Sequence, residues 1–257
     1  MRHQVKPKAY MENDRRPLKS RSWPLMARLA KWLAAREISP NQISVAGMVF
    51  GIGAGAALAM TSIVNEAGEI VVGWARVLFI LAAVLIQLRL LCNLIDGMVA
   101  IEGKKQSKVG MLYNELPDRV SDVAGFVGAG FAAMGNVELG FAAAVFAVMT
   151  AYVRAVGKAE GAGNDFCGPM AKPHRMAMLT VMCMLMAVLP SGAHAWWSGV
   201  VRDVAVHMPG VLAEKMMTGV ESRFGLMGFG LLLIAMGSAW TCVRRTVRLA
   251  RRMNACE

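Results

Sequence analysis

The sequence has little charge: only 18% of its 257 residues are charged, whereas 56% are hydrophobic and the mean hydropathy is +0.46. This composition is typical of a small polytopic membrane protein. The five cysteines show no paired spacing, so we expect free thiols and neither a disulfide nor a zinc site. The first 22 residues lack an apolar core, so we expect no cleavable signal peptide.

The net charge of +11 is concentrated at the two ends of the chain and in short loops between apolar runs. Anionic lipid headgroups are the simplest partner for charge in those places. We therefore expect membrane lipids as partners and no nucleic acid.

Six apolar runs approach the length of about 20 residues that a helix needs to cross a bilayer. The expected fold is all-α, a polytopic membrane protein with six transmembrane helices. The third run is interrupted by acids, and the fourth and fifth are short. The runs lie at about Ile43–Val64, Val77–Ile101, Leu112–Met134, Leu139–Ala155, Arg175–Leu189 and Gly225–Val243.

The orientation follows from the lysines and arginines, which favour the cytoplasmic side of a membrane. They gather before the first run, after the second and fourth runs, and in the tail, whereas the alternate loops have few or balance them with acids. We therefore predict a bacterial-type inner (plasma) membrane protein with both termini and the polar cluster facing the cytoplasm.

A short amphipathic segment precedes the first run. Between residues 23 and 36, Leu25, Leu29 and Leu33 recur at helical spacing, while Arg28 and Lys31 point to another face. We expect an N-terminal interfacial helix, the alternative being a packed cytoplasmic helix. The expected organisation is a basic N-terminal segment at 1–22, a transmembrane domain at 23–245 and a basic cytoplasmic tail at 246–257.

Between residues 93 and 122, ionisable and amide side chains interrupt this apolar sequence. Asn93 and Asp96 share one helical face, and Asn114, Asp118 and Asp122 step by four residues along another, with Glu115 on the same face. Two helices joined by a short loop pack antiparallel, so we expect these faces to converge. Arg89, one turn before Asn93, is expected to pair with a carboxylate or to snorkel rather than to touch a substrate.

Acids at bilayer depth normally face a cation or a polar cavity. Oxygen ligands without histidine or thiolate favour Mg²⁺, Mn²⁺ or Ca²⁺ over zinc. The alternative is a hydrogen-bond network between helices, in which Lys108 and Arg119 neutralise carboxylates.

The cluster resembles the signature of the CDP-alcohol phosphatidyltransferases, D-x2-D-G-x2-A-R-x8-G-x3-D-x3-D. Its spacing is met without a gap, and the run ISPNQIS at 38–44 is similar to the family's entry into its first span. The identity departs at Asn93, Asn114 and Ile101, which replace two Asp and one Arg. The matching positions are Asn93, Asp96, Gly97, Ala100, Gly110, Asn114 and Asp118.

The resemblance implies transfer of a phosphatidyl or related phosphoalcohol group from CDP-diacylglycerol, or another CDP-linked donor, to an alcohol acceptor, with release of CMP. It implies Asp118 as the catalytic base and two metal ions, Mg²⁺ or Mn²⁺, held by Asn93, Asp96, Asn114 and Asp118. The two asparagines should weaken such a two-metal site. Glu115 and Asp122 are our additions to this metal set, since they share the face. The resemblance further implies a homodimer. The expected substrate-binding residues are Gly97, Ala100, Gly110, Lys172 and Arg175, although positive charge at the membrane surface explains the last two equally well.

Two other functions remain open. The two asparagines and Ile101 are compatible with a protein that has lost turnover and serves as a lipid-binding or scaffold subunit. Intramembrane acids are also compatible with an ion-coupled transporter.

Overall fold

The computed structural model describes residues 23–64, 70–102, 110–161, 163–190, 196–197, 199–200, 203, 207 and 225–254. Within these ranges the chain is helical, and the only strand-like feature is an isolated bridge between Val64 and Ile70. The all-α prediction is therefore confirmed for the described residues. The Lys108 of the predicted alternative network and the segment 1–22 lie outside them.

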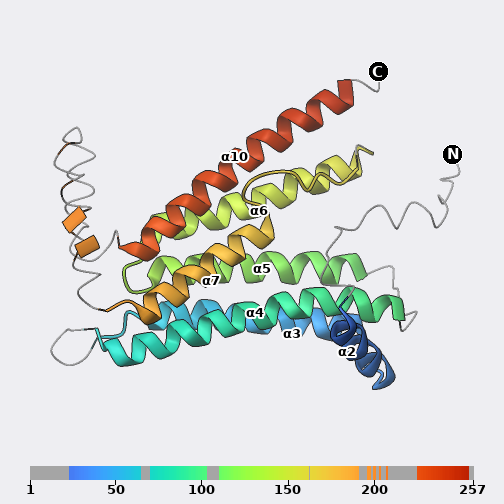
Figure 1. The fold of residues 1–257 in the computed structure, drawn as a ribbon. Coiled ribbons are helices and arrows are strands. Elements are labelled where there is room, and N and C mark those ends of the chain that lie inside the picture. Colours follow the sequence, from blue (N-terminus) through green and yellow to red (C-terminus); the bar gives the residue numbers. More distant parts are fainter. Residues whose placement is uncertain are drawn as a thin grey trace, which may run out of the picture.

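The long helices coincide with the six predicted apolar runs and lie side by side in one bundle (Figure 1). A shorter helix, α2, precedes them. The helices are α2 (Pro24–Ala35), α3 (Pro40–Met60), α4 (Val72–Glu102), α5 (Gly110–Phe131), α6 (Val137–Ala159), α7 (Lys172–Val188) and α10 (Leu226–Asn254).

Four helices, α3, α4, α6 and α10, are long and apolar enough to cross a membrane. Helix α5 has the length but carries Glu115, Asp118, Arg119 and Asp122, and α7 has only 17 residues. Both pack among the other helices, so their charged side chains face protein rather than lipid. The count of six spans remains a prediction.

The start of α3 is specified locally. Ser39 Oγ accepts a hydrogen bond from the Gln42 amide at 3.2 Å, and Gln42 Oε1 accepts one from the Ser39 amide at 2.8 Å. This capping box satisfies two free amides, and Pro40 in the first turn has no amide N–H that needs an acceptor. The run at 38–44 therefore ends the preceding turn and sets where Ser44 enters the bundle.

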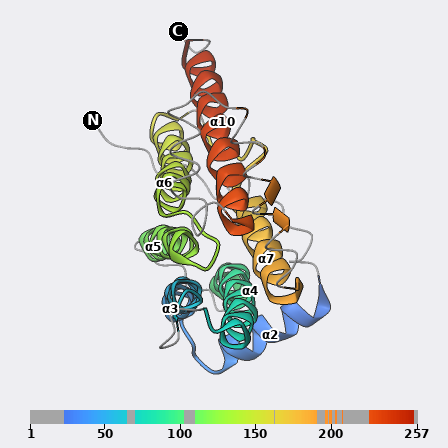
Figure 2. The same cartoon turned by 90° about the vertical axis from the view of Figure 1, so that its left-hand side faces the viewer.

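Helix α2 lies across the end of the bundle near α3 and α4 (Figure 2). Its Ala30 is fully buried and belongs to a cluster with Ile43, Ile95 and Val99, whereas Leu25 stays largely exposed. The predicted N-terminal helix is thus present as a helix with one packed face. Its position in a membrane interface remains a prediction.

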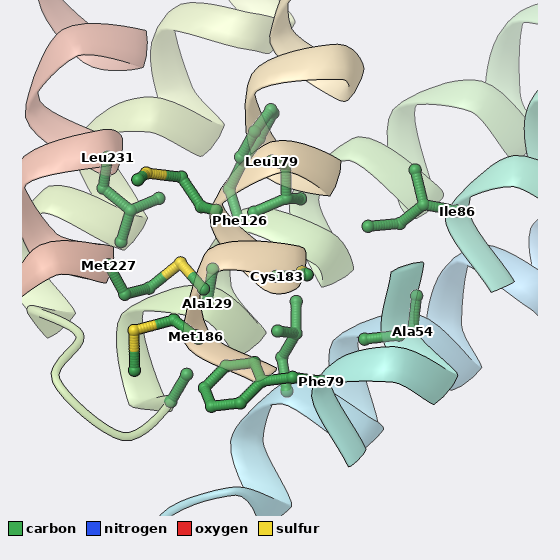
Figure 3. Packing of buried hydrophobic residues seen from close by; sticks show 14 of the residues in the cluster. Ala54, Phe79, Ile86, Phe126, Ala129, Leu179, Cys183, Met186, Met227 and Leu231 are labelled. Carbon is green, nitrogen blue, oxygen red and sulfur yellow. The ribbon is translucent and has the colours of Figure 1, made fainter. Parts of the chain in front are cut away.

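The main apolar core joins α3 to α7 and α10 around buried side chains such as Phe79, Phe126 and Leu231 (Figure 3). Helix α7 contributes Leu179 and Cys183 to the same cluster. This core holds one half of the bundle tightly, and the polar cluster lies beside it. That this side faces the cytoplasm remains a prediction.

Helices α3 and α5 approach until their backbones touch. A Cβ on Gly55 would overlap the Ala124 carbonyl, and a Cβ on Gly128 would overlap the backbone of Gly55. Small residues allow such contact between membrane helices. Because α5 cannot rotate in this glycine seam between α3 and α5, its Asp118 and Asp122 face α4 and α7.

One expectation about packing is corrected. Helices α4 and α5, although joined by a short connection, make few direct contacts, because α3 packs against both of them. The small side chains of α3 let it occupy the position between its two successors. Space is left between the polar faces of α4 and α5, and the candidate site lies there.

Helix α10 continues to Asn254, so the predicted boundary between residues 245 and 246 falls inside one helix. Arg245, on the helix, is buried rather than part of a solvated tail.

The seam predicts a difference between two glycines of α3. Gly55→Ala should lower the free energy of unfolding by about 1–3 kcal/mol, because the added methyl has no room. Gly53→Ala is the matched control, since its Cβ would meet only Leu85 Cδ1 at an ordinary 3.5 Å. Unfolding in mixed micelles with increasing SDS measures both; equal stability of the two variants would contradict the seam.

Candidate active site

Two cavities meet at the polar cluster. The larger, of about 820 Å³, is lined mainly by apolar side chains of α2, α4, α5 and α7. The smaller, of about 100 Å³, lies toward α6 and α10 and is lined by five basic and two acidic side chains. The residues common to both linings are Asn114, Asp118, Arg154, Phe166 and Lys172.

Asp118 therefore stands on the wall between an apolar and a basic compartment. Its Oδ2 forms an ion pair with Lys172 Nζ, from the first residue of α7. Arg89 Nη2 lies 3.7 Å from Oδ1, and Arg119 Nη2 lies 3.8 Å from Oδ2. Three cations therefore surround this one carboxylate.

Asp96 lies deeper, on α4, with 6% of its surface exposed. Ser44 Oγ donates to its Oδ2 at 2.7 Å, and the Gly97 amide lies 2.5 Å from its Oδ1. The hydroxyl of α3 thus orients a carboxylate of α4. Around Gly97 a Cβ would meet nothing within 4 Å, so the space predicted beside this glycine is present.

Asp122 is fully buried between two arginines. Arg89 Nη2 donates to its Oδ1 at 2.5 Å, and Arg175 Nη2 donates to its Oδ2 at 3.3 Å. Arg89 also donates to the Asp118 carbonyl at 3.1 Å, and Arg175 Nη1 donates to Thr150 Oγ1 at 3.0 Å. In place of the metal that the sequence led us to expect at Asp122, both oxygens face guanidinium groups.

Arg175 belongs to the same network. This side chain, expected at a substrate phosphate, is 2% exposed and donates hydrogen bonds to Asp122, Thr150 and the Met170 carbonyl. It borders the smaller cavity from behind. Arg89 pairs with a carboxylate, as its position in an apolar helix led us to expect.

Glu115 is also paired with cations rather than turned toward Asp96. Its Oε1 forms an ion pair with Arg154 of α6, and its Oε2 lies 3.2 Å from Arg119 Nη2. Of the remaining predicted residues, Ala100 and Gly110 are half-buried and lie outside the described linings of both cavities.

The two asparagines line the larger cavity together with Asp118, as the spacing predicted. Asn93 Nδ2 is buried and has no hydrogen-bond partner. Since the oxygen and nitrogen of an amide occupy equivalent positions, a half-turn of this group presents its carbonyl oxygen at the same place. A buried amide with this freedom suits a bound cation.

The donor set fits a divalent metal of the hard class. Asp118 offers carboxylate oxygens at the larger cavity, and Asn93 and Asn114 offer amide oxygens there. Asp96 lies outside both cavity linings but near enough for its charge to interact with that of Asp118. Mg²⁺ and Mn²⁺ accept such ligands, with water or substrate phosphates completing the shell. Among the described residues, no three His, Cys, Asp or Glu side chains converge into a site of their own. The metal fit therefore depends on the amides.

The sequence analysis did not identify two arginines that line the site, Arg154 and Arg245. Arg154 stacks over Phe166 at 5.7 Å and lines both cavities. Arg245 donates from Nε to the Cys167 carbonyl and from Nη1 to the Thr150 carbonyl, both at 2.8 Å. Charge within apolar sequence was the available signal for Arg154, whereas Arg245 was hidden among the arginines of the tail.

Comparisons with known proteins place the fold. No family model matches the sequence. The inner membrane protein YnbA of Escherichia coli (strain K12) is 21% identical over 174 residues, which cover 68% of this chain and 80% of that protein.

Two solved structures of the Mycobacterium tuberculosis phosphatidylinositol phosphate synthase PgsA1 share the fold, each with a TM-score of 0.60 and 18% identity. The complex with manganese and citrate is matched over 87% of this chain and 88% of that one. The structure with CDP-DAG bound is matched over 88% of this chain and 94% of that one.

The buried arginines predict the effect of removing Asp122. Asp122→Asn leaves two buried guanidinium groups without their counterion and should lower the free energy of unfolding by about 3–5 kcal/mol. Glu138→Gln, at an exposed carboxylate near the far end of α6, is the control and should change stability little. SDS-induced unfolding measures both. A stable Asp122→Asn protein that has lost metal binding would instead make Asp122 a ligand.

Proposed function

We propose that this protein is an integral membrane transferase of the CDP-alcohol phosphatidyltransferase type, acting in phospholipid biosynthesis. It moves a phosphatidyl or related phosphoalcohol group from a CDP-linked donor to an alcohol and releases CMP. The observation that carries this proposal is the position of Asp118 on the wall shared by a large apolar cavity and a small basic one.

The larger cavity suits the lipid part of a donor such as CDP-diacylglycerol. Apolar side chains of α4 and α7 line it, and Trp23 and Met26 close it from the side of α2. Asn93, Asn114 and Asp118 stand at its polar end, where a diphosphate would lie. The likeness in fold to a synthase solved with CDP-DAG bound supports this assignment.

In the proposed reaction, Asp118 takes the proton of the acceptor hydroxyl while that oxygen attacks the phosphorus bearing the lipid group. The bond from this phosphorus to the bridging oxygen breaks, and CMP leaves with that oxygen and its electron pair. Lys172 and Arg89 hold the Asp118 carboxylate in place for the proton transfer. A bound Mg²⁺ or Mn²⁺ would neutralise charge on the diphosphate.

The smaller cavity favours an acceptor that itself carries an anionic group. Its basic side chains outnumber its acids by five to two, and arginine binds phosphate through paired donors. A phosphorylated polyol fits this compartment better than a neutral or cationic alcohol does.

The charges also support the proposed orientation. The basic end of α10 and helix α2 lie at the same end of the bundle (Figure 1), beside the shared wall. With this end at the cytoplasmic face of an inner membrane, water-soluble acceptors and CMP have direct access. A homodimer belongs to the same proposal and follows from the family resemblance alone.

The first test is CMP release by the purified protein in lipid nanodiscs, with CDP-diacylglycerol, Mg²⁺ or Mn²⁺ and a panel of alcohols. We expect metal-dependent CMP, and a fall in kcat of about 10²- to 10⁴-fold in Asp118→Asn. Glu138→Gln should retain full activity because it lies far from both cavities.

The other outcomes separate the competing functions. CDP-diacylglycerol binding without CMP from any acceptor would favour the lipid-binding or scaffold protein. Nucleotide-independent proton or metal flux in sealed vesicles would favour the ion-coupled transporter. Either result, with a known transferase active in parallel, would contradict the proposal.

The basic cavity gives a second prediction. Arg154→Gln should raise the KM for a phosphorylated acceptor by about 10- to 100-fold, since a hydrogen bond to a charged group contributes about 1.5–3 kcal/mol. The KM for the donor should change less, although Arg154 also lines the larger cavity. Arg248→Gln, a partly exposed arginine paired with Asp165, is the control. An unchanged acceptor KM in Arg154→Gln would exclude this cavity as the acceptor site.

A further inference from the structure

We propose that the site binds one divalent cation per chain, and that the Lys172 ammonium supplies the second positive charge beside the diphosphate. The role of the diphosphate rests on the proposed function, whereas the number of cations is a property of the folded chain. A cluster of four carboxylates would allow more than one cation. The number of cations therefore depends on which carboxylates are not already held by two arginines.

Two of the four carboxylates are already neutralised. Asp122 has a guanidinium group at each oxygen, from Arg89 and Arg175, and is fully buried. Glu115 likewise has Arg154 at Oε1 and Arg119 at Oε2. A dication at either position would have to displace two arginines.

The ligands that remain are two carboxylates and two amides. Asp96 and Asp118 bring two negative charges, one of them already paired with Lys172, while Asn93 and Asn114 add oxygen donors without charge. Two dications would bring twice the positive charge of these two acids, in addition to the ammonium. The orphaned Asn93 amide supports one bound cation at this end of the cavity.

The Lys172 ammonium takes the place of a second divalent cation. Its ammonium is ion-paired with Asp118 Oδ2, and its side chain is 22% exposed and lines both cavities. A cation fixed on this oxygen competes with a metal for it and repels a second dication nearby. Because it lies on the shared wall, the ammonium is placed to contact the phosphate that is transferred.

Asp118 then has two roles on separate oxygens. Oδ2 holds the ammonium, while Oδ1 has only Arg89 Nη2 at 3.7 Å and remains available to a metal or a proton. One carboxylate therefore links the bound cation, the lysine and the acceptor hydroxyl.

The test counts Mn²⁺ bound to the wild-type protein in nanodiscs of zwitterionic lipid, with CDP present, by calorimetry and by the electron paramagnetic resonance of free Mn²⁺. We expect one Mn²⁺ per chain, none in Asp96→Asn, and one in the control Glu138→Gln. Two Mn²⁺ per wild-type chain, or none, would overturn the proposal whether or not the enzyme turns over.

A gain of binding tests the role of the lysine. The triple variant Asn93→Asp, Asn114→Asp, Lys172→Met restores two acids and removes the ammonium, so it should bind two Mn²⁺ per chain. A triple variant that is folded, judged by wild-type helical circular dichroism, and still binds one would overturn the part given to Lys172 and the amides. Absence of CMP release with one bound Mn²⁺ would contradict the proposed function and leave this inference standing.

Discussion

The pairing of Asp122 with Arg89 and Arg175 is the constraint on which the site depends. Asp122 pairs with both arginines, and Asp118 Oδ1 lies 3.7 Å from Arg89 Nη2, so these charges are tolerable at this depth only while α4, α5 and α7 hold one relative position. The glycine seam between α3 and α5 fixes the rotation of α5 from the other side. Asp118, one turn before Asp122, is thereby held at the wall between the cavities without being buried itself.

In the proposed reaction, the division into two compartments would let one site serve two unlike substrates. A lipid donor needs an apolar surface that opens toward the membrane, whereas a polar acceptor needs charge and access to water. Helix α3 separates α4 from α5 enough to leave room for the first, and the arginines of α5, α6 and α10 form the second. The reacting group is placed where the compartments meet.

Periodicity predicted the helices and the shared face of Asn114 and Asp118, because both follow from local geometry. It did not predict which side chains these acids contact. Spacing put Asp122 and Asp118 on one face, but Asp122 accepts hydrogen bonds from arginines of two other helices. Ser44 and Arg154 reach the cluster through packing between distant segments, which no local pattern encodes. The expected direct packing of α4 on α5 failed because the small residues of α3 fit between them.

The order of the charges along the chain also has a consequence for biogenesis. Arg89 leaves the ribosome before Asp122, and Arg175 follows both. An arginine alone in a bilayer is costly, so α4 gains by entering the membrane as a hairpin with α5, carrying its counterion with it. When α7 arrives, its own arginine finds an oxygen of Asp122 already in place. The acid therefore acts as an assembly point, and insertion of the early helices prepares the docking of the later one.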